Sequence, residues 1–266
     1  MGLVAALSQR SSAAQQRCLE SKHAHAAIVA AMCGRFTYRY TWRRLAELMG
    51  LIRWLSVELT PRFNVAPSQS APVVRLSADG TRQGDLLRWG LLPSWADDPA
   101  IGNRHVNARA ETVGVKSAFR VAFSRQRCLV PVSGFYEWRV LRDRKTKQPY
   151  LIARADGEPF ALAGLWDRCV IDSTSIESFT IITTSPNDLM SRLHDRMPVM
   201  IDEPDFDRWL EGVALGDAER ARLLEARSWN GFEMFPVRRL VNSPTIDAPE
   251  VVGRIAEPDE SEGFLF

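Results

Sequence analysis

The stretch RCLVPVSGFYEWRVLRDRKTKQPYLIARADGEPFALAGL, residues 127–165, contains four runs of apolar, β-branched and aromatic residues. The runs have the length of strands and cover Arg127–Val132, Gly134–Val140, Pro149–Ala153 and Phe160–Leu165. Ala155-Asp156-Gly157-Glu158 is a turn signal between the last two runs. Strands joined by short turns favour antiparallel pairing, so this stretch predicts the centre of an antiparallel sheet.

The rest of the chain extends this sheet and adds helices. Further strand-like runs cover Cys33–Tyr38, Pro72–Leu76, Asp85–Trp89 and Phe179–Thr184. Thr41 can cap a helix that ends at Gly50, and other helical patterns cover Lys116–Phe123, Pro204–Glu211 and Asp217–Ala226. Arg62–Ala71 contains Pro67 and polar residues and is bordered by Pro61 and Pro72, which predicts an ordered loop. With no repeat or linker, the pattern predicts a single α+β domain with a mostly antiparallel, barrel-like sheet and peripheral helices.

The composition is that of an ordinary globular protein: 266 residues, 45% hydrophobic and 25% charged. No apolar run approaches the roughly 18 residues of a membrane span, so we expect no membrane attachment. The four cysteines, Cys18, Cys33, Cys128 and Cys169, lie far apart, which favours a reducing, cytoplasmic setting over a disulfide framework or a zinc site. His23 and His25 lack nearby ligand partners, and we predict neither a metal nor a cofactor.

Charge is distributed unevenly along the chain. Cys33–Arg154 contains 21 Lys and Arg against 9 Asp and Glu, whereas Ala155–Phe266 contains 10 against 22. The basic excess suggests that one part of the protein binds a polyanion. Alternatively, the two halves pair their charges within one domain.

The two ends of the chain read differently from the middle. Residues 1–32 are rich in Ala, Ser and Gln, and Leu3–Leu7 is too short for a secretory signal, although a transit peptide stays open. We expect translation to start at Met32, and the first 32 residues to be absent from the mature protein, so that Cys33 is its N-terminus. Residues 257–266 are acidic and predict a loose tail after a domain of residues 33–256.

An N-terminal cysteine has a free α-amine and a thiol on adjacent carbons. The amine, with a pKa of about 8, can attack an aldehyde to give an imine, and the thiol can close a thiazolidine ring. Only a Cys33 freed of the residues before it offers this chemistry, because an internal cysteine has an amide nitrogen. The alternative is a buried structural cysteine.

Three other stretches contain reactive groups. Asn107-Ala108-Arg109-Ala110-Glu111-Thr112 alternates polar side chains with alanines. Glu137 lies among the aromatic residues of Gly134–Trp138, where burial would raise its pKa into the range of a general acid or base; the alternative is a strand residue facing solvent. His194 precedes Asp195 and Arg196, which would set its charge and hold a phosphate, although lone histidines are often structural.

Together these stretches resemble the SRAP family, the SOS response-associated peptidase-like proteins that crosslink to abasic DNA. The matching motifs occur in the family's order from Cys33 to about Glu250. They are Cys33–Phe36, Arg62–Pro67, Trp89–Trp95, Asn107–Thr112, Gly134–Trp138 and His194–Pro198. One departure is that 31 residues precede Met32, whereas the family needs its cysteine first after the initiator.

The resemblance implies a role in the DNA-damage response, with single-stranded DNA containing abasic sites as partner and a monomeric protein. It implies that Cys33 forms the crosslink, with Asn107, Glu137 and His194 around it. Arg35, Arg109 and Arg196 would contact phosphates, and Asn64, Pro67, Trp95 and Trp138 would shape the DNA groove. His194 or Glu137 would protonate the sugar ring oxygen, and Asn107 would orient the aldehyde or the amine.

Several alternatives stay open at this point. The imine intermediate could undergo β-elimination, giving weak lyase activity. Cys33 with His194 could act as a cysteine peptidase that removes its own leader. An N-terminal cysteine followed by glycine also resembles glutamine amidotransferases, and a non-catalytic module that binds single-stranded DNA would fit the charge.

Overall fold

The structure is a computed structural model, and it describes residues 33–141 and 147–258. The predicted leader, His23 and His25, and nearly all of the acidic tail lie outside the described residues. Within the described ranges, no helix is long and apolar enough to cross a membrane.

The first sheet has five strands in the order β14-β9-β8-β1-β3, and every neighbouring pair is antiparallel. Its strands are β1 (Arg35–Tyr38), β3 (Arg62–Val65), β8 (Gly134–Val140), β9 (Lys147–Arg154) and β14 (Phe232–Pro236). The sheet therefore brings the start of the domain beside strands that lie about a hundred residues later in the sequence.

The second sheet has nine strands and closes on itself. Its strands are β2 (Arg53–Trp54), β4 (Ser70–Leu76), β5 (Arg82–Trp89), β6 (Asn107–Arg109), β7 (Arg127–Val132), β10 (Phe160–Ile171), β11 (Thr174–Thr184), β12 (Met197–Pro198) and β13 (Met200–Ile201). The order β11-β10-β7-β4-β5 is antiparallel, and a parallel pairing of β5 with β11 completes the ring. This closure confirms the prediction of a barrel-like, mostly antiparallel sheet in a single α+β domain.

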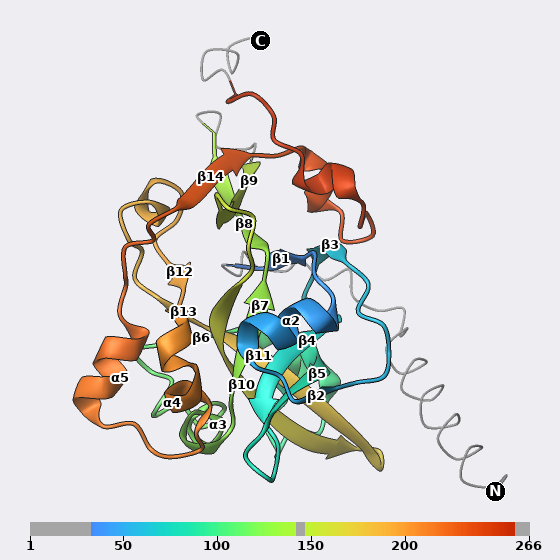
Figure 1. The fold of residues 1–266 in the computed structure, drawn as a ribbon, viewed down its shortest axis with the longest axis vertical. Coiled ribbons are helices and arrows are strands. Elements are labelled where there is room, and N and C mark those ends of the chain that lie inside the picture. Colours follow the sequence, from blue (N-terminus) through green and yellow to red (C-terminus); the bar gives the residue numbers. More distant parts are fainter. Residues whose placement is uncertain (1–32, 142–146, 259–266) are drawn as a thin grey trace, which may run out of the picture. The chain divides into compact units, whose positions relative to one another are not determined.

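The helices lie at the periphery, as Figure 1 shows. They are α2 (Trp42–Met49), α3 (Arg120–Arg125), α4 (Phe206–Leu210) and α5 (Asp217–Leu224), with 3-10 turns at η1 (Pro99–Arg104), η2 (Met190–Arg192), η3 (Glu203–Asp205), η4 (Arg239–Asn242) and η5 (Pro249–Val252). In α2, the Thr41 hydroxyl accepts a hydrogen bond from the Arg44 N–H at 3.3 Å, and Gly50 ends the helix at a φ of 63°. Both helix signals read from the sequence are confirmed.

Two hydrophobic clusters lie on opposite faces of β8. Phe135 points into the main core, where Phe36 packs against Trp89 of the barrel with ring centroids 4.9 Å apart. Tyr136 points to the other face, where it packs with Leu151 and with valines of the C-terminal segment. Both faces of this sheet are therefore covered, and each fully buried large side chain contributes roughly 1.5–3 kcal/mol.

The strands β7 and β8 begin and end where the sequence predicts, whereas two other predictions are wrong. Arg62–Ala71 is not a loop, because it contains β3 and the start of β4. The prolines misled the interpretation: Pro61 precedes β3 and Pro67 follows it, so neither interrupts the strand. The helix predicted from Lys116 begins only at Arg120, after a series of turns.

Candidate active site

Cys33 and Glu137 are in direct contact, although 104 residues separate them. The antiparallel register of β1 and β8 sets Arg35 opposite Tyr136, so Cys33 lies beside the end of β8. The backbone nitrogen of Cys33 donates to Glu137 Oε1 at 2.7 Å. Cys33 is 0% exposed and Glu137 is 4% exposed, so the alternative of a solvent-facing glutamate is wrong.

Burial is the main influence on both side chains. It raises the pKa of Glu137 to about 7, against the opposing effect of the N–H groups of Cys33 and Trp138. Burial, followed by the nearby Glu137 carboxylate, raises the pKa of the Cys33 thiol well above its ordinary value. At neutral pH, the site therefore holds a carboxyl group that can both accept and give a proton, beside a cysteine in its thiol form.

His194 has its tautomer set by the backbone. Its Nδ1 accepts the Arg196 N–H at 3.1 Å, so the neutral ring carries its proton on Nε2. Asp195 Oδ1 also lies 2.8 Å from Nδ1, a contact that favours a protonated ring instead. The Asp195 side chain is 86% exposed and free to turn into water, so the fixed backbone donor determines the tautomer. Burial lowers the pKa of His194, which also favours the neutral ring.

Arg196 joins the His194 loop to β6. Its guanidinium binds both carboxylate oxygens of Glu111, at 2.5 and 2.9 Å, and the Thr183 carbonyl at 2.7 Å. Thr183 pairs in turn with Arg109 in the parallel β6–β11 register. Arg196 therefore holds the Asn107–Arg109 strand and the His194 loop together, and most of its hydrogen-bonding capacity is already used.

Asn107 and Arg109 line an open cleft of about 580 Å³. The other lining residues include Arg104, His105, Lys116 and Phe119. Arg104, Arg109 and Lys116 are exposed, and none of them forms an ion pair with a carboxylate in the described part of the chain. The cleft therefore presents three exposed cationic side chains beside Asn107, one of the predicted site residues.

The basic first half of the sequence pairs in part with the acidic second half and in part stays exposed at the cleft. Several basic residues of the first half do pair with acidic residues of the second half, through Arg44–Glu158, Arg62–Asp247, Arg75–Glu177 and Arg82–Asp207. Charge pairing inside the domain is thus real, while the cleft keeps the cations that a polyanion would need.

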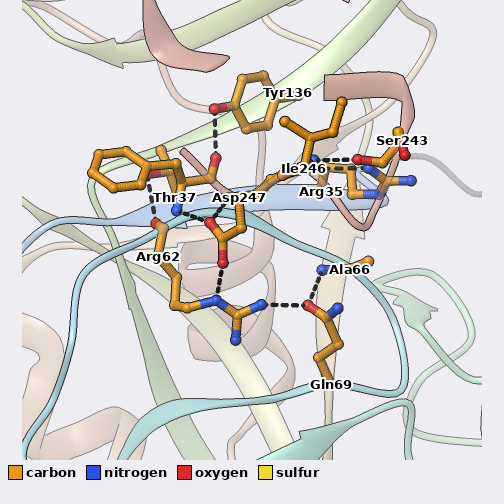
Figure 2. Close-up of polar contacts among 11 residues, drawn as sticks. Arg35, Thr37, Arg62, Ala66, Gln69, Tyr136, Ser243, Ile246 and Asp247 are labelled. Carbon is orange, nitrogen blue, oxygen red and sulfur yellow. Dashed lines mark hydrogen bonds and ion pairs between the residues drawn. The ribbon is translucent and has the colours of Figure 1, made fainter. Parts of the chain in front are cut away.

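Arg35 and Asn64 bind each other and the C-terminal segment. Arg35 Nη1 donates to Asn64 Oδ1 at 2.9 Å and to the Val241 carbonyl at 2.6 Å. Asn64 is 0% exposed, and its amide donates to the carbonyls of Val241, Ser243 and Ile246. Figure 2 shows Arg35 beside Ser243 and Ile246 in this arrangement. Asn64 therefore affects any groove only through the segment it holds.

The remaining predicted groove residues differ in exposure. Trp95 is 58% exposed, in a loop whose Ser94 N–H binds Asp167 of β10 at 3.0 Å, and it has no hydrogen bond to Cys33 or Glu137 in the described residues. Pro67 is half-buried in the turn between β3 and β4. Trp138 is half-buried at the end of β8, and its Nε1–H donates to Asn242 Oδ1 at 2.7 Å.

Sequence reasoning missed several residues of this region. Arg104 and Lys116 are only part of a general basic excess in the sequence, and His105 belongs to no motif. Asn242 and Asp247 belong to no motif, so only the fold reveals their contacts with Trp138 and β3. In the described ranges, no group of three or more His, Cys, Asp or Glu is arranged to hold a metal ion.

Comparison with known proteins adds an independent finding. Residues 32–244 match the family described as SOS response associated peptidase (SRAP). The abasic site processing protein YoqW of Bacillus subtilis is 38% identical over 223 residues, which cover 83% of this chain and 99% of that protein. The abasic site processing protein YedK of Escherichia coli is 28% identical over 227 residues, which cover 83% and 99%. A crystal structure of a protein from Bacteroides thetaiotaomicron has a TM-score of 0.74 at 27% identity, covering 84% of this chain and 100% of that one.

Proposed function

Because the chain belongs to the SOS response associated peptidase family, we propose that it captures abasic sites in single-stranded DNA through a covalent bond to Cys33. One observation carries the proposal: the Cys33 nitrogen lies 2.7 Å from a buried carboxyl group whose pKa is raised to about 7. A nitrogen in that position becomes a nucleophile once it is an α-amine. The relatives' names, abasic site processing proteins, support an abasic sugar as the electrophile.

The first step forms an imine. An α-amine has a pKa of about 8, and burial raises the pKa of Glu137 from its ordinary value, so the carboxylate can accept the ammonium proton. The neutral amine adds to the aldehyde carbon of the ring-opened sugar, and Glu137 returns the proton to the departing hydroxyl. One water leaves, and a carbon–nitrogen double bond forms.

The second step closes the thiazolidine ring. The Cys33 sulfur adds to the imine carbon, the thiol proton is taken up by Glu137 or the ring nitrogen, and no further atom is lost. The raised pKa of the thiol keeps it protonated until the imine has formed. The net change is the loss of one water from protein plus DNA.

His194 acts in this scheme as a neutral hydrogen-bond donor. With Nδ1 occupied by the Arg196 N–H, its Nε2–H is available to the sugar ring oxygen or the aldehyde oxygen. Glu137 is the better candidate for proton exchange, because its pKa lies near neutrality whereas that of His194 is lowered by burial.

The DNA strand binds through its phosphates at the cleft. Arg104, Arg109 and Lys116 supply positive charge that recognises any sequence, and Asn107 lies among them. In this proposal the protein acts as a monomer in the cytoplasm.

Covalent capture requires Cys33 to be the N-terminal residue of the active protein. Start of translation at Met32, or self-cleavage before Cys33, would each meet this requirement. The peptidase alternative has less support, because neither His194 nor His105 hydrogen bonds to the Cys33 thiol in the described residues, and the pKa of that thiol is raised. Weak lyase activity would follow from β-elimination at the imine, and glutaminase activity would instead support the amidotransferase reading.

The test is the intact mass of protein expressed from Met32, before and after incubation with a single-stranded oligonucleotide carrying one abasic site. We expect a chain that begins at Cys33 and gains the oligonucleotide's mass less one water. An unchanged mass despite a free Cys33 would overturn covalent capture and favour a non-catalytic binding module.

A further inference from the structure

The indole of Trp138 is fixed by one side chain far away in the sequence. Its Nε1–H donates to Asn242 Oδ1 at 2.7 Å. An indole has a single donor and no acceptor, so this bond leaves Trp138 no polar group with which to read a base edge. What Trp138 can offer to a ligand is the face of its ring.

The backbone around Asn242 is held at three successive carbonyls. Arg35 Nη1 and Asn64 Nδ2 donate to the Val241 carbonyl at 2.6 and 3.2 Å. Arg35 Nη2 lies 3.5 Å from the Asn242 carbonyl, and Asn64 Nδ2 donates to the Ser243 carbonyl at 2.9 Å. Asn242 therefore presents its side-chain oxygen from a rigid position.

The other end of this segment is anchored on β3 by Asp247, as Figure 2 shows. One carboxylate oxygen accepts the N–H groups of Phe63 at 2.6 Å and Asn64 at 3.0 Å, and the other pairs with Arg62. The segment from Val241 to Asp247 is thus fixed at both ends to the five-stranded sheet. We call it the C-terminal clamp.

We propose that Asn242 is a positioning residue for DNA binding, fixing Trp138 as a sequence-neutral stacking platform for a base next to the abasic site. This inference rests on the proposed function. Trp138 directly follows Glu137 in β8, and their side chains point to opposite faces of the strand. The indole packs in part against the Tyr136 cluster, so it takes no part in the Cys33–Glu137 contact and is left for a neighbouring base. An aromatic face stacks on any base, and a ring already held in place loses less freedom on binding.

Arg35 and Asn64 take part in the same arrangement, because they hold the backbone of the clamp. Both were expected to contact DNA or shape its groove, and both spend their hydrogen bonds on the carbonyls that flank Asn242. They act on the strand through Trp138, as further positioning residues.

The experiment measures non-covalent binding, so that it does not depend on the crosslink. The probe is a single-stranded oligonucleotide with a tetrahydrofuran abasic analogue, which has no aldehyde, flanked by 2-aminopurine. Stacking on Trp138 quenches the fluorescence of that base. Asn242→Ala is expected to weaken binding about 5-fold, the effect of one lost hydrogen bond, and to reduce the quenching. Asn242→Asp keeps an acceptor for the indole and is expected to restore both.

A double-mutant cycle and a control outside the clamp decide the outcome. Trp138→Phe keeps a ring but lacks the N–H, so adding Asn242→Ala to it should cause no further loss. Ser175→Ala, at an exposed position of β11, is expected to bind like the wild type. Normal binding by Asn242→Ala, or an equal loss in the Trp138→Phe background, would overturn the inference.

The proposed function is tested separately, by crosslinking of the wild-type protein to a natural abasic site. A wild type that fails to crosslink while Asn242 still governs the quenching would contradict covalent capture and leave the positioning role standing. A wild type that crosslinks, with quenching that does not depend on Asn242, would support covalent capture and contradict the positioning role.

Discussion

The Cys33–Glu137 contact and the cleft around Arg109 belong to different sheets and differ in their access to water. Cys33 and Glu137 are 0% and 4% exposed on the five-stranded sheet, whereas Arg104, Arg109 and Lys116 are exposed beside the barrel. In the buried region, desolvation moves a carboxyl pKa to about 7. In the cleft, the cations stay charged and their attraction for phosphate is screened by salt.

The buried contact and the exposed cleft are therefore suited to different steps of the proposed function. Proton transfer needs a dry site with a tuned pKa, and capture of a polyanion needs charge that is open to solvent. Variants on the buried side should therefore change the rate at saturating DNA, and variants in the cleft should change affinity and its dependence on salt.

The largest expected effect is that of Cys33→Ser on the buried side. A serine at the N-terminus keeps the α-amine and loses the sulfur, so an imine still forms but no thiazolidine follows. We expect complete loss of the heat-stable adduct on a denaturing gel, with an imine that borohydride still traps. A heat-stable product from the serine variant would show that the sulfur has no part in the bond.

Glu137→Gln should slow crosslinking by about 10²-fold at saturating DNA and leave affinity nearly unchanged. The ionised carboxylate is the form that accepts the ammonium proton, so the wild-type rate should rise from about pH 5.5 to about pH 7.5. The glutamine variant should be slower at every pH and should follow the α-amine alone, with a rise that continues toward pH 8 in single-turnover measurements. An identical pH profile for both proteins would remove Glu137 from the proton transfer.

The same substitution should stabilise the fold at alkaline pH. The pKa of Glu137 is about 7 in the folded protein against a model value of 4.5, so the folded state binds the proton more tightly. Stability is therefore lost as the pH rises from 4.5 through 7, and a neutral glutamine avoids that loss. We expect the free energy of unfolding at pH 8 to rise by about 1–3 kcal/mol, with little change at pH 4. Urea denaturation at the two pH values measures it.

In the cleft, the double variant Arg104→Gln, Lys116→Gln should weaken binding without changing the crosslinking rate at saturation. Each phosphate contact to a single strand contributes about 0.7 to the slope of log affinity against log salt. Loss of two contacts should therefore remove ~7-fold of the affinity change between 50 and 200 mM salt. Arg43→Gln, an exposed arginine on α2, is the matched control. An unchanged salt slope would exclude the cleft from the DNA path.

The smallest expected effect is that of Asp247→Asn in the C-terminal clamp. The asparagine keeps one acceptor for the β3 N–H groups and loses the ion pair with Arg62, whose side chain is 29% exposed. We expect about 1 kcal/mol of lost stability by thermal denaturation and an unchanged salt slope. A changed slope would mean that the clamp and the cleft are coupled.

Local signals in the sequence predicted much of the fold. The apolar and aromatic runs of β7 and β8 and the Thr41 and Gly50 signals of α2 depend on near neighbours in the chain, and they are confirmed. β3 was missed because its partners are distant: β1 pairs with one side, and Asp247 binds two of its N–H groups. Asp247 lies 184 positions from Phe63 and 183 from Asn64, so its contacts with β3 leave no local pattern in the sequence.

The roles of the candidate site residues were even harder to predict from the sequence than the strands. The resemblance to the SRAP family grouped Cys33, Glu137 and His194, but the roles of the arginines depend on their partners. Arg35, Arg109 and Arg196 looked alike in the sequence, yet Arg35 binds carbonyls and Arg196 binds Glu111. Arg109 is exposed in the cleft, and that difference could be seen only once the strands were paired.

Asp247 has one more consequence, for how molecules of this protein meet. β3 is the last strand of the five-stranded sheet, and the border of a sheet is normally a template on which another chain can add a strand. The Asp247 carboxylate occupies two of the donors that such a strand would need. The same side chain that anchors the clamp thus leaves fewer free donors at this border for a strand of another molecule.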